Sequence, residues 1–295
     1  MNQNIPLAVL ITVLTTVLFA WAATLQHQAV GDESGGAEQQ DTLGGGQLVA
    51  LLRSPRWWLG MGLNAAGAAL SVVALLMAPV TVVQPLAILA VPWTVLMASR
   101  IHGHRVLPAV WGAVALAIAG TAWFAVVAVQ HAVEHDVFDD TGLVVGSMVV
   151  FAVAAALALV GARGPRAWRC FAWASAAAVI FGLESGLVRA LGEFLYAGTW
   201  RGSVTFWAVV VLLVIGAVIA TVFQQQAYAN GPAEIVVGAL NAIGPVTAVL
   251  FGIAVLGEGA ALTPTASVMM VIACAIAVTG VVLLSRFHPT SAPVG

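Results

Sequence analysis

The sequence contains very few charged residues and no lysine. Of its 295 residues only 7% are charged, and all ten positive residues are arginines. A soluble domain carries about 25% charged residues, because it must cover its core with a solvated surface. The deficit excludes a soluble globular protein. The absence of lysine excludes an ATP-binding phosphate loop, whose motif requires that residue. With a net charge of −2 and no basic face, nothing points to nucleic acid.

Cysteine is almost absent as well. The two cysteines, Cys170 and Cys274, lie at or within apolar runs. This excludes a disulfide framework, and both residues are expected to be reduced packing residues.

The chain is rich in apolar residues, with 61% hydrophobic residues and a mean hydropathy of +1.03. A helix of about 20 apolar residues crosses a bilayer. We predict an all-α integral membrane protein with about nine transmembrane helices. The first run lacks the positive residues of a signal peptide and is expected to stay as a helix. The predicted helices are 6–25, 57–77, 80–99, 107–129, 142–160, 171–190, 206–226, 233–256 and 265–284.

The long connections divide these helices into two halves. Residues 1–129 form a first half of four helices, which includes a Gly- and Gln-rich segment, 26–56, predicted to be a flexible cytoplasmic loop. Residues 142–285 form a second half of five helices, and 286–295 form a short tail.

The arginines predict how the chain is oriented. Arginines accumulate in cytoplasmic loops, so the side with more of them is expected to face the cytoplasm. This predicts a multi-pass protein of the inner membrane with the C-terminus inside and the N-terminus outside. Arg201 falls on the outer side and Arg189 near it, whereas the inner side holds Arg53, Arg56, Arg100, Arg105, Arg163, Arg166, Arg169 and Arg286.

Two stretches of the chain, 78–127 and 228–284, follow the same plan. Pro92 lies 13 residues after Pro79, just as Pro245 lies 13 residues after Pro232. The two copies, helices two to four and seven to nine, start five helices apart, and an odd separation reverses their direction through the membrane. Inverted repeats of this kind characterise secondary transporters that work by alternating access to a site near the bilayer midplane.

Glu184 is the first candidate site residue, because a carboxylate inside an apolar helix is costly unless it is neutral, paired or hydrated. It can carry a proton coupled to transport, or it can be a protonated residue that bonds a neighbouring helix. Asn64, Gln84 and Asn241 complete the predicted site. Their amides can bind a cation or polar solute, or only hold helices together. The run Gln224 to Gln226 is expected to meet lipid headgroups.

Three groups of residues carry a resemblance to a known family: Arg53-Ser54-Pro55-Arg56-Trp57-Trp58-Leu59-Gly60, then Ala78-Pro79 with Val83-Gln84-Pro85-Leu86, and the terminal unit with Gly244-Pro245 and Gly257-Glu258. They resemble the drug/metabolite transporter (EamA-like) superfamily, and the nine-helix layout with one helix missing from the first half is similar to its NIPA-type magnesium transporter branch. The resemblance implies a helical bundle with a central polar cavity and no ATP hydrolysis.

We therefore expect a secondary transporter in the lipid bilayer, not an enzyme, and without a cofactor. Its substrate is a small polar metabolite, drug or cation, or alternatively magnesium. Two further alternatives come from other classes. The segment His131-Ala-Val-Glu134-His135 has the spacing of a zinc peptidase motif. A scaffold that transports nothing would have a dry interior. The oligomeric state is left open.

Overall fold

The computed structural model describes residues 5–33, 43–77, 87–102, 107–131, 140–255 and 263–287. Within these ranges the chain forms helices and short connections and contains no strand. The elements are α1 (Ile5–Glu33), α2 (Gly45–Leu51), α3 (Pro55–Met77), the 3₁₀ turn η1 (Ala87–Leu89), α5 (Ala90–His102), α6 (Pro108–His131), α7 (Asp140–Arg163), α8 (Arg166–Tyr196), α9 (Val204–Asn230), α10 (Ala233–Val255) and α11 (Pro264–Phe287).

Six of these helices are long and apolar enough to cross a membrane. They cover Pro6–Asp32, Thr141–Arg163, Arg166–Gly192, Val204–Asn230, Ala233–Val255 and Pro264–Leu284. Shorter apolar helices cover Ala87–Met97 and Pro108–Phe124. The prediction of an all-helical membrane protein is confirmed, while the count of nine spans and the inverted repeat stay predictions.

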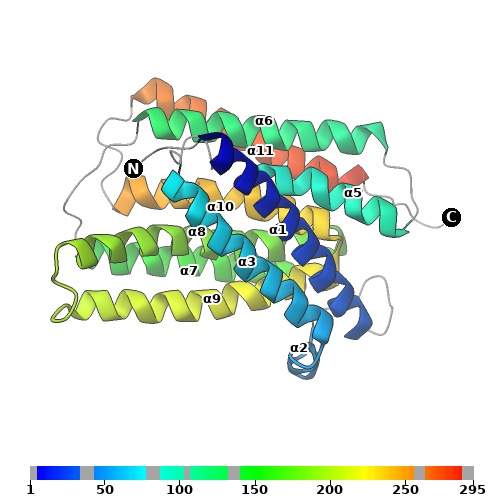
Figure 1. Ribbon diagram of the computed structural model, residues 1–295, viewed down its shortest axis with the longest axis horizontal. Coiled ribbons are helices and arrows are strands. Elements are labelled where there is room, and N and C mark those ends of the chain that lie inside the picture. The colour runs from blue at the N-terminus through cyan, green and yellow to red at the C-terminus, as the bar shows by residue number, and fades with distance from the viewer. Residues whose placement is uncertain are drawn as a thin grey trace.

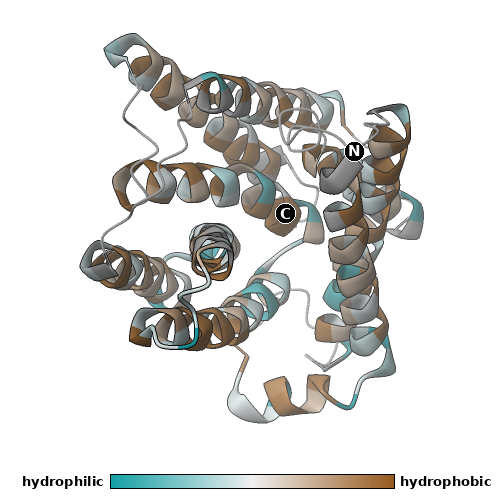
Figure 2. Cartoon of the chain, turned by 60° about the vertical axis from the view of Figure 1, so that its left-hand side comes forward, coloured by the Kyte–Doolittle hydropathy of each residue, from teal (hydrophilic) through white to brown (hydrophobic). Residues whose placement is uncertain are grey.

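Helix α8 packs against α7, α9 and α10, and α7, α8 and α9 run along the long axis of the molecule as one layer (Figure 1). The residues of α8 from Ala172 to Ile180 are all buried. The outward faces of α7 and α9 instead expose Val149 and Val153, and Val214 and Val218. The ribbon coloured by hydropathy is apolar along much of the length of the helices (Figure 2). This is the pattern of helices that face lipid on one side and protein on the other.

Helices α1 and α3 form a second pair, which crosses in front of this layer in Figure 1. They approach closely because α3 presents glycines to α1. A Cβ atom built on Gly60 would lie 3.0 Å from the carbonyl oxygen of Ala22, and one on Gly67 would lie 2.7 Å from the ring of Phe19. Small residues let two helix backbones meet in this way.

Helices α6 and α11 form a third pair with reciprocal contacts. A Cβ atom on Gly120 of α6 would lie 2.7 Å from Cα of Ala277, and a Cβ atom on Gly280 of α11 would lie 2.7 Å from Cα of Ala117. Ala117 of α6 thus contacts Gly280 of α11, and Gly120 contacts Ala277. Residue numbers rise along α6 where they fall along α11. The two helices are therefore antiparallel, and at this crossing each contributes the same contacts to the other.

Several helix boundaries differ from those predicted. Helix α1 continues to Glu33 rather than ending at residue 25, and α9 continues to Asn230 rather than ending at 226. Part of the expected flexible loop, 43–51, is ordered and includes α2, and its Leu43 and Leu51 are buried. The predicted helix 80–99 is described only from Ala87, as η1 followed by α5.

Pro92 is the third residue of α5, which follows η1 without a gap, so the chain is already helical from Ala87. A proline has no N–H, so the carbonyl of Ile88 in η1 receives no hydrogen bond from position 92. Pro85 lies outside the described residues.

Candidate functional site

Pro245 lies inside α10 and changes the hydrogen bonding of the residue one turn before it. A proline has no N–H, so the carbonyl of Asn241 receives no hydrogen bond from position 245. The side-chain amide of Asn241 donates to the carbonyl of Val237 at 2.9 Å, which leaves its own Oδ1 oxygen as an acceptor. Half-buried Asn241 thus offers two oxygen atoms at one level of α10.

This level of α10 is pressed against α8. A Cβ atom on Gly182 of α8 would lie 2.7 Å from Cβ of Thr247 and 3.1 Å from the backbone nitrogen of Ala248. One turn later, a Cβ atom on Gly186 would lie 2.5 Å from Cδ1 of Phe251. The two glycines let α8 support α10 directly around Pro245, so the position of the Asn241 carbonyl is set by backbone packing.

Glu184 faces a different neighbour. It is about 200° around α8 from Gly182, because each residue turns the helix by about 100°. A Cβ atom on Gly216 of α9 would lie 3.1 Å from Glu184 Oε1. This oxygen is buried and has no hydrogen-bond partner among the residues that the structure describes. The carboxylate therefore lies at the α8–α9 contact, on the side of α8 away from α10.

Asn64 lies on the stripe of α3 that faces α1. It follows Gly60 by four residues and precedes Gly67 by three, and residues with this spacing share one face of a helix. Since both glycines touch α1, half-buried Asn64 faces α1 between them.

The four predicted site residues are thus spread over the bundle. Asn241 is on α10, Glu184 at the α8–α9 contact and Asn64 at the α1–α3 contact, and Gln84 lies outside the described residues. Glu184 contacts α9 at Gly216, whereas the side chain of Asn241 bonds within its own helix to Val237. Whether these residues bind substrate stays a prediction. The corners Gly103-His104 and Gly257-Glu258 also lie outside the described residues.

A second set of polar residues was misjudged from the sequence. Gln224, Gln225 and Gln226 were expected at lipid headgroups, yet they are buried, with 8%, 2% and 4% of their surfaces exposed. Gln225 Nε2 donates to Oε1 of Gln26, a fully buried residue of α1, at 3.0 Å. The signal in the sequence was that two amide-rich stretches, 26–28 and 224–226, end helices on the same predicted side of the membrane.

The zinc peptidase alternative finds no support in the described part of the chain. Among those residues no group of three or more His, Cys, Asp or Glu side chains is placed to hold a metal ion. Its motif falls almost wholly outside them, because the side chain of His131 and residues 132–139 are not described.

The described chain is helical, and several of its helices are long and apolar enough to cross a membrane. Helix α10 contains Pro245, and α8 carries Glu184 within its apolar length. The chain is therefore a polytopic membrane protein. The comparison with known families goes further. The family model described as Magnesium transporter NIPA matches residues 4–289, so the chain belongs to this family and is a membrane transporter. No curated protein and no solved structure matches the chain.

Proposed function

We propose that this transporter carries Mg²⁺ across the membrane by alternating access of two inverted halves. The observation that supports Mg²⁺ as the substrate is the match to the magnesium transporter family, which spans nearly the whole chain, residues 4–289. The NIPA-type branch, kept as the alternative to a metabolite or drug carrier on sequence grounds, thereby becomes the first candidate.

The chemistry around Asn241 supports a hard cation as the substrate. Mg²⁺ prefers oxygen ligands and keeps several of its waters, so a passing ion needs only a few protein oxygens. Asn241 supplies its Oδ1 and the carbonyl oxygen to which Pro245 donates no hydrogen bond. Two neutral oxygens bind weakly enough to release the ion, as transport requires. We assign Asn241 as the primary substrate residue, with Asn64 and Gln84 as further candidates.

The packing of the helices supports an inverted repeat. A two-fold axis perpendicular to α6 and α11 exchanges Gly120 with Gly280 and Ala117 with Ala277, as expected if the two helices are equivalent members of opposite copies. The other pairings agree with the same shift of five spans, since α1 packs on α3 as α8 packs on α9. Helix α7 then has no counterpart in the first half.

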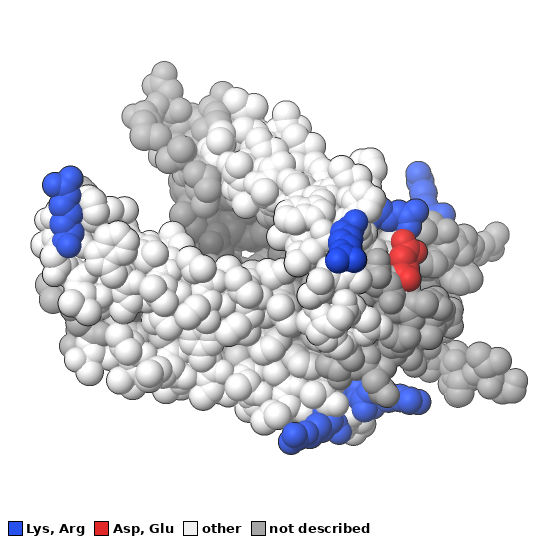
Figure 3. All heavy atoms as spheres, turned by 90° about the horizontal axis from the view of Figure 1, so that it is seen from below, with Lys and Arg blue, Asp and Glu red and all other residues white. Residues whose placement is uncertain are grey.

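The distribution of arginines supports an inner-membrane orientation with the α2 end in the cytoplasm. Several of the arginine side chains drawn in Figure 3 gather at one end of the molecule, and Arg201 precedes α9 at the opposite end. The exposed arginines Arg53, Arg56, Arg163 and Arg166 belong to the elements at the α2 end.

Flux measurements test the proposal. The purified protein is reconstituted in liposomes that contain a fluorescent Mg²⁺ indicator, and an inward Mg²⁺ gradient is applied. We expect saturable influx that is absent from protein-free liposomes. Asn241→Ala should reduce influx at low Mg²⁺ about tenfold, the effect of losing roughly 1.4 kcal/mol of binding. Thr279→Ala is the matched control, because this exposed hydroxyl of α11 bonds only its own helix in the described structure.

Influx no greater than in protein-free liposomes would refute magnesium as the substrate. Asn241→Ala with wild-type influx would refute the assigned residue but leave the substrate in place.

Glu184 favours a second candidate, a proton-coupled carrier of a small polar metabolite or drug. A buried carboxylate oxygen without a partner among the described residues is suited to gain and lose a proton. Uptake of a polar solute that follows an imposed pH gradient, in liposomes that show no Mg²⁺ influx, would favour this candidate.

A further inference from the structure

The two proposed halves are joined by hydrogen bonds at the α2 end of the bundle. Gln226 makes two of them with a single residue, Leu43, which precedes α2. The backbone N–H of Leu43 donates to Gln226 Oε1 at 2.6 Å, and Gln226 Nε2 donates to the carbonyl of Leu43 at 2.9 Å. Both residues are 4% exposed. The side-chain amide of Gln226 thus bonds both the backbone N–H and the backbone carbonyl of Leu43, a residue of the other half.

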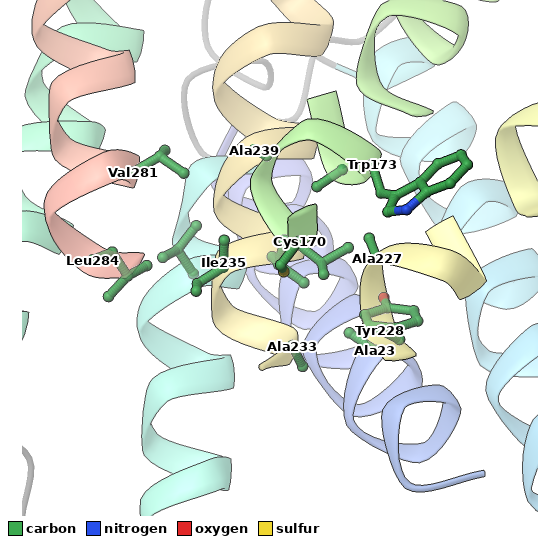
Figure 4. Close-up of a cluster of buried hydrophobic side chains, with 14 of the residues drawn as sticks. Ala23, Cys170, Trp173, Ala227, Tyr228, Ala233, Ile235, Ala239, Val281 and Leu284 are labelled. Atoms are coloured by element: carbon green, nitrogen blue, oxygen red, sulfur yellow. The ribbon is translucent and has the colours of Figure 1, made fainter. Parts of the chain in front are cut away.

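Two further bonds lie beside this pair. Gln225 Nε2 donates to Gln26 Oε1 at 3.0 Å, and His27 Nδ1 donates to the backbone carbonyl of Tyr228 at 3.1 Å. All four bonds run from residues 26–43 of the first half to the last turns of α9 in the second half. Ala23 of α1 lies beside Tyr228 in the same buried cluster (Figure 4).

Two of these amides are incompletely bonded. Gln225 Oε1 is buried and has no hydrogen-bond partner in the described structure, and Gln26 Nε2 finds only the sulfur of Met61 at 3.6 Å. A buried acceptor without a partner costs free energy that water would recover. Separation of α1 and α9 would hydrate these groups, which offsets part of the cost of breaking the four bonds. A contact of this kind can both close and open.

We propose that Gln26, Leu43, Gln225 and Gln226, called the amide clamp, form the gate that closes the α2 end of the bundle during transport. The inference rests on the proposed function, because alternating access requires contacts between the halves that form in one state and break in the other. The structure represents the state in which this end is closed. The ligand reaches the α2 side only when the clamp is broken.

The accessibility of α1 at the clamp tests the proposal without any substrate. Ala23→Cys is introduced into a chain with Cys170→Ala and Cys274→Ala, so that it is the only thiol. Ala23 is 3% exposed and shares a face of α1 with Gln26 and His27, because it precedes them by three and four residues. Its rate of alkylation by N-ethylmaleimide, followed by mass spectrometry, therefore reports how often the clamp opens.

Gln226→Ala should raise the alkylation rate at least about fivefold, because two hydrogen bonds are lost and the backbone of Leu43 is left unpaired. Gln224→Ala is the matched control. Gln224 lies beside the clamp, but its side-chain amide donates to Tyr228 Oη at 3.0 Å within α9 and bonds to no other helix in the described residues. The control should leave the rate within twofold of the parent.

Equal rates in Gln226→Ala and the parent, or an equal rise in Gln224→Ala, would overturn the proposal. If Gln226→Ala does not give folded protein, Gln225→Leu removes the bond to Gln26 while filling the same space, and the same rise is expected. Mg²⁺ influx of the parent is measured in parallel. If Gln226→Ala is alkylated faster but the parent shows no Mg²⁺ influx, magnesium is rejected as the substrate and the gate is retained. If the parent shows Mg²⁺ influx but Gln226→Ala is alkylated no faster, only the gate is rejected.

Discussion

The contact between α6 and α11 allows a quantitative test of the proposed two-fold relation between the halves. Gly120→Ala places a methyl group 2.7 Å from Cα of Ala277, and Gly280→Ala places one 2.7 Å from Cα of Ala117. Real Cβ atoms do not approach backbone atoms so closely, and neither backbone can rotate away as a flexible side chain would. The helices must therefore move apart, and overpacking of this kind costs about 1–3 kcal/mol.

The sharper expectation is equality. Because the two glycines have the same surroundings, the two single variants should lose the same stability within about 0.5 kcal/mol. The double variant should lose less than the sum, since helices already separated for one methyl group accommodate the second. Gly112→Ala, on the same α6, is the matched control. A Cβ atom there meets nothing within 4 Å, so this variant should gain up to about 1 kcal/mol from helix propensity.

Unfolding by SDS in mixed micelles, followed by circular dichroism, measures these differences. A loss in Gly120→Ala together with no loss in Gly280→Ala would refute the symmetric contact. Full additivity in the double variant would show that the two glycines do not share one crossing.

Two further variants probe the candidate site. Pro245→Ala gives α10 an N–H donor for the carbonyl of Asn241. The variant should be about 1 kcal/mol more stable in SDS unfolding and should have a higher KM for Mg²⁺ influx. An unchanged KM would argue against this carbonyl as a ligand. Glu184→Gln keeps the shape of the side chain but cannot carry a proton, so any stimulation of uptake by a pH gradient should disappear while folding is preserved; stimulation that persists would exclude Glu184 as the coupling residue.

The sequence was sufficient for the helical class and most helix positions, because long apolar runs are strong signals in a chain with so few charges. It failed where polar residues continue a helix. Residues 26–33 extend α1 and 227–230 extend α9, although hydropathy falls at both places. These turns are helical because they pack against each other and exchange side-chain hydrogen bonds, and hydropathy does not indicate which polar groups will find partners.

The candidate site illustrates the same limit. Proline spacing drew attention to Pro245, which the structure places inside α10, because a missing N–H is a local property of the chain; the role of Asn241 stays a prediction. The direction of Glu184 depends on which side of α8 packs against Gly216 of α9 and which side presents Gly182 and Gly186 to α10, and that information lies in the packing of three helices. The sequence therefore predicts which polar residues lie inside helices more reliably than it predicts which neighbouring helix each side chain contacts.

The two kinds of contact between the proposed halves suit different tasks in a rocking motion. At the α6–α11 crossing, Gly120 and Gly280 bring the two backbones into direct contact, so the helices meet there through the close packing of small residues. At the α2 end, buried amides hold α1 and the residues before α2 to α9, and movement there exchanges specific bonds for water. In a membrane, apolar packing gains little from the hydrophobic effect, because lipid tails are as apolar as the side chains. The energy difference between the two states of the transporter should therefore reside mainly in the amide contacts, and the crossing should act as the axis.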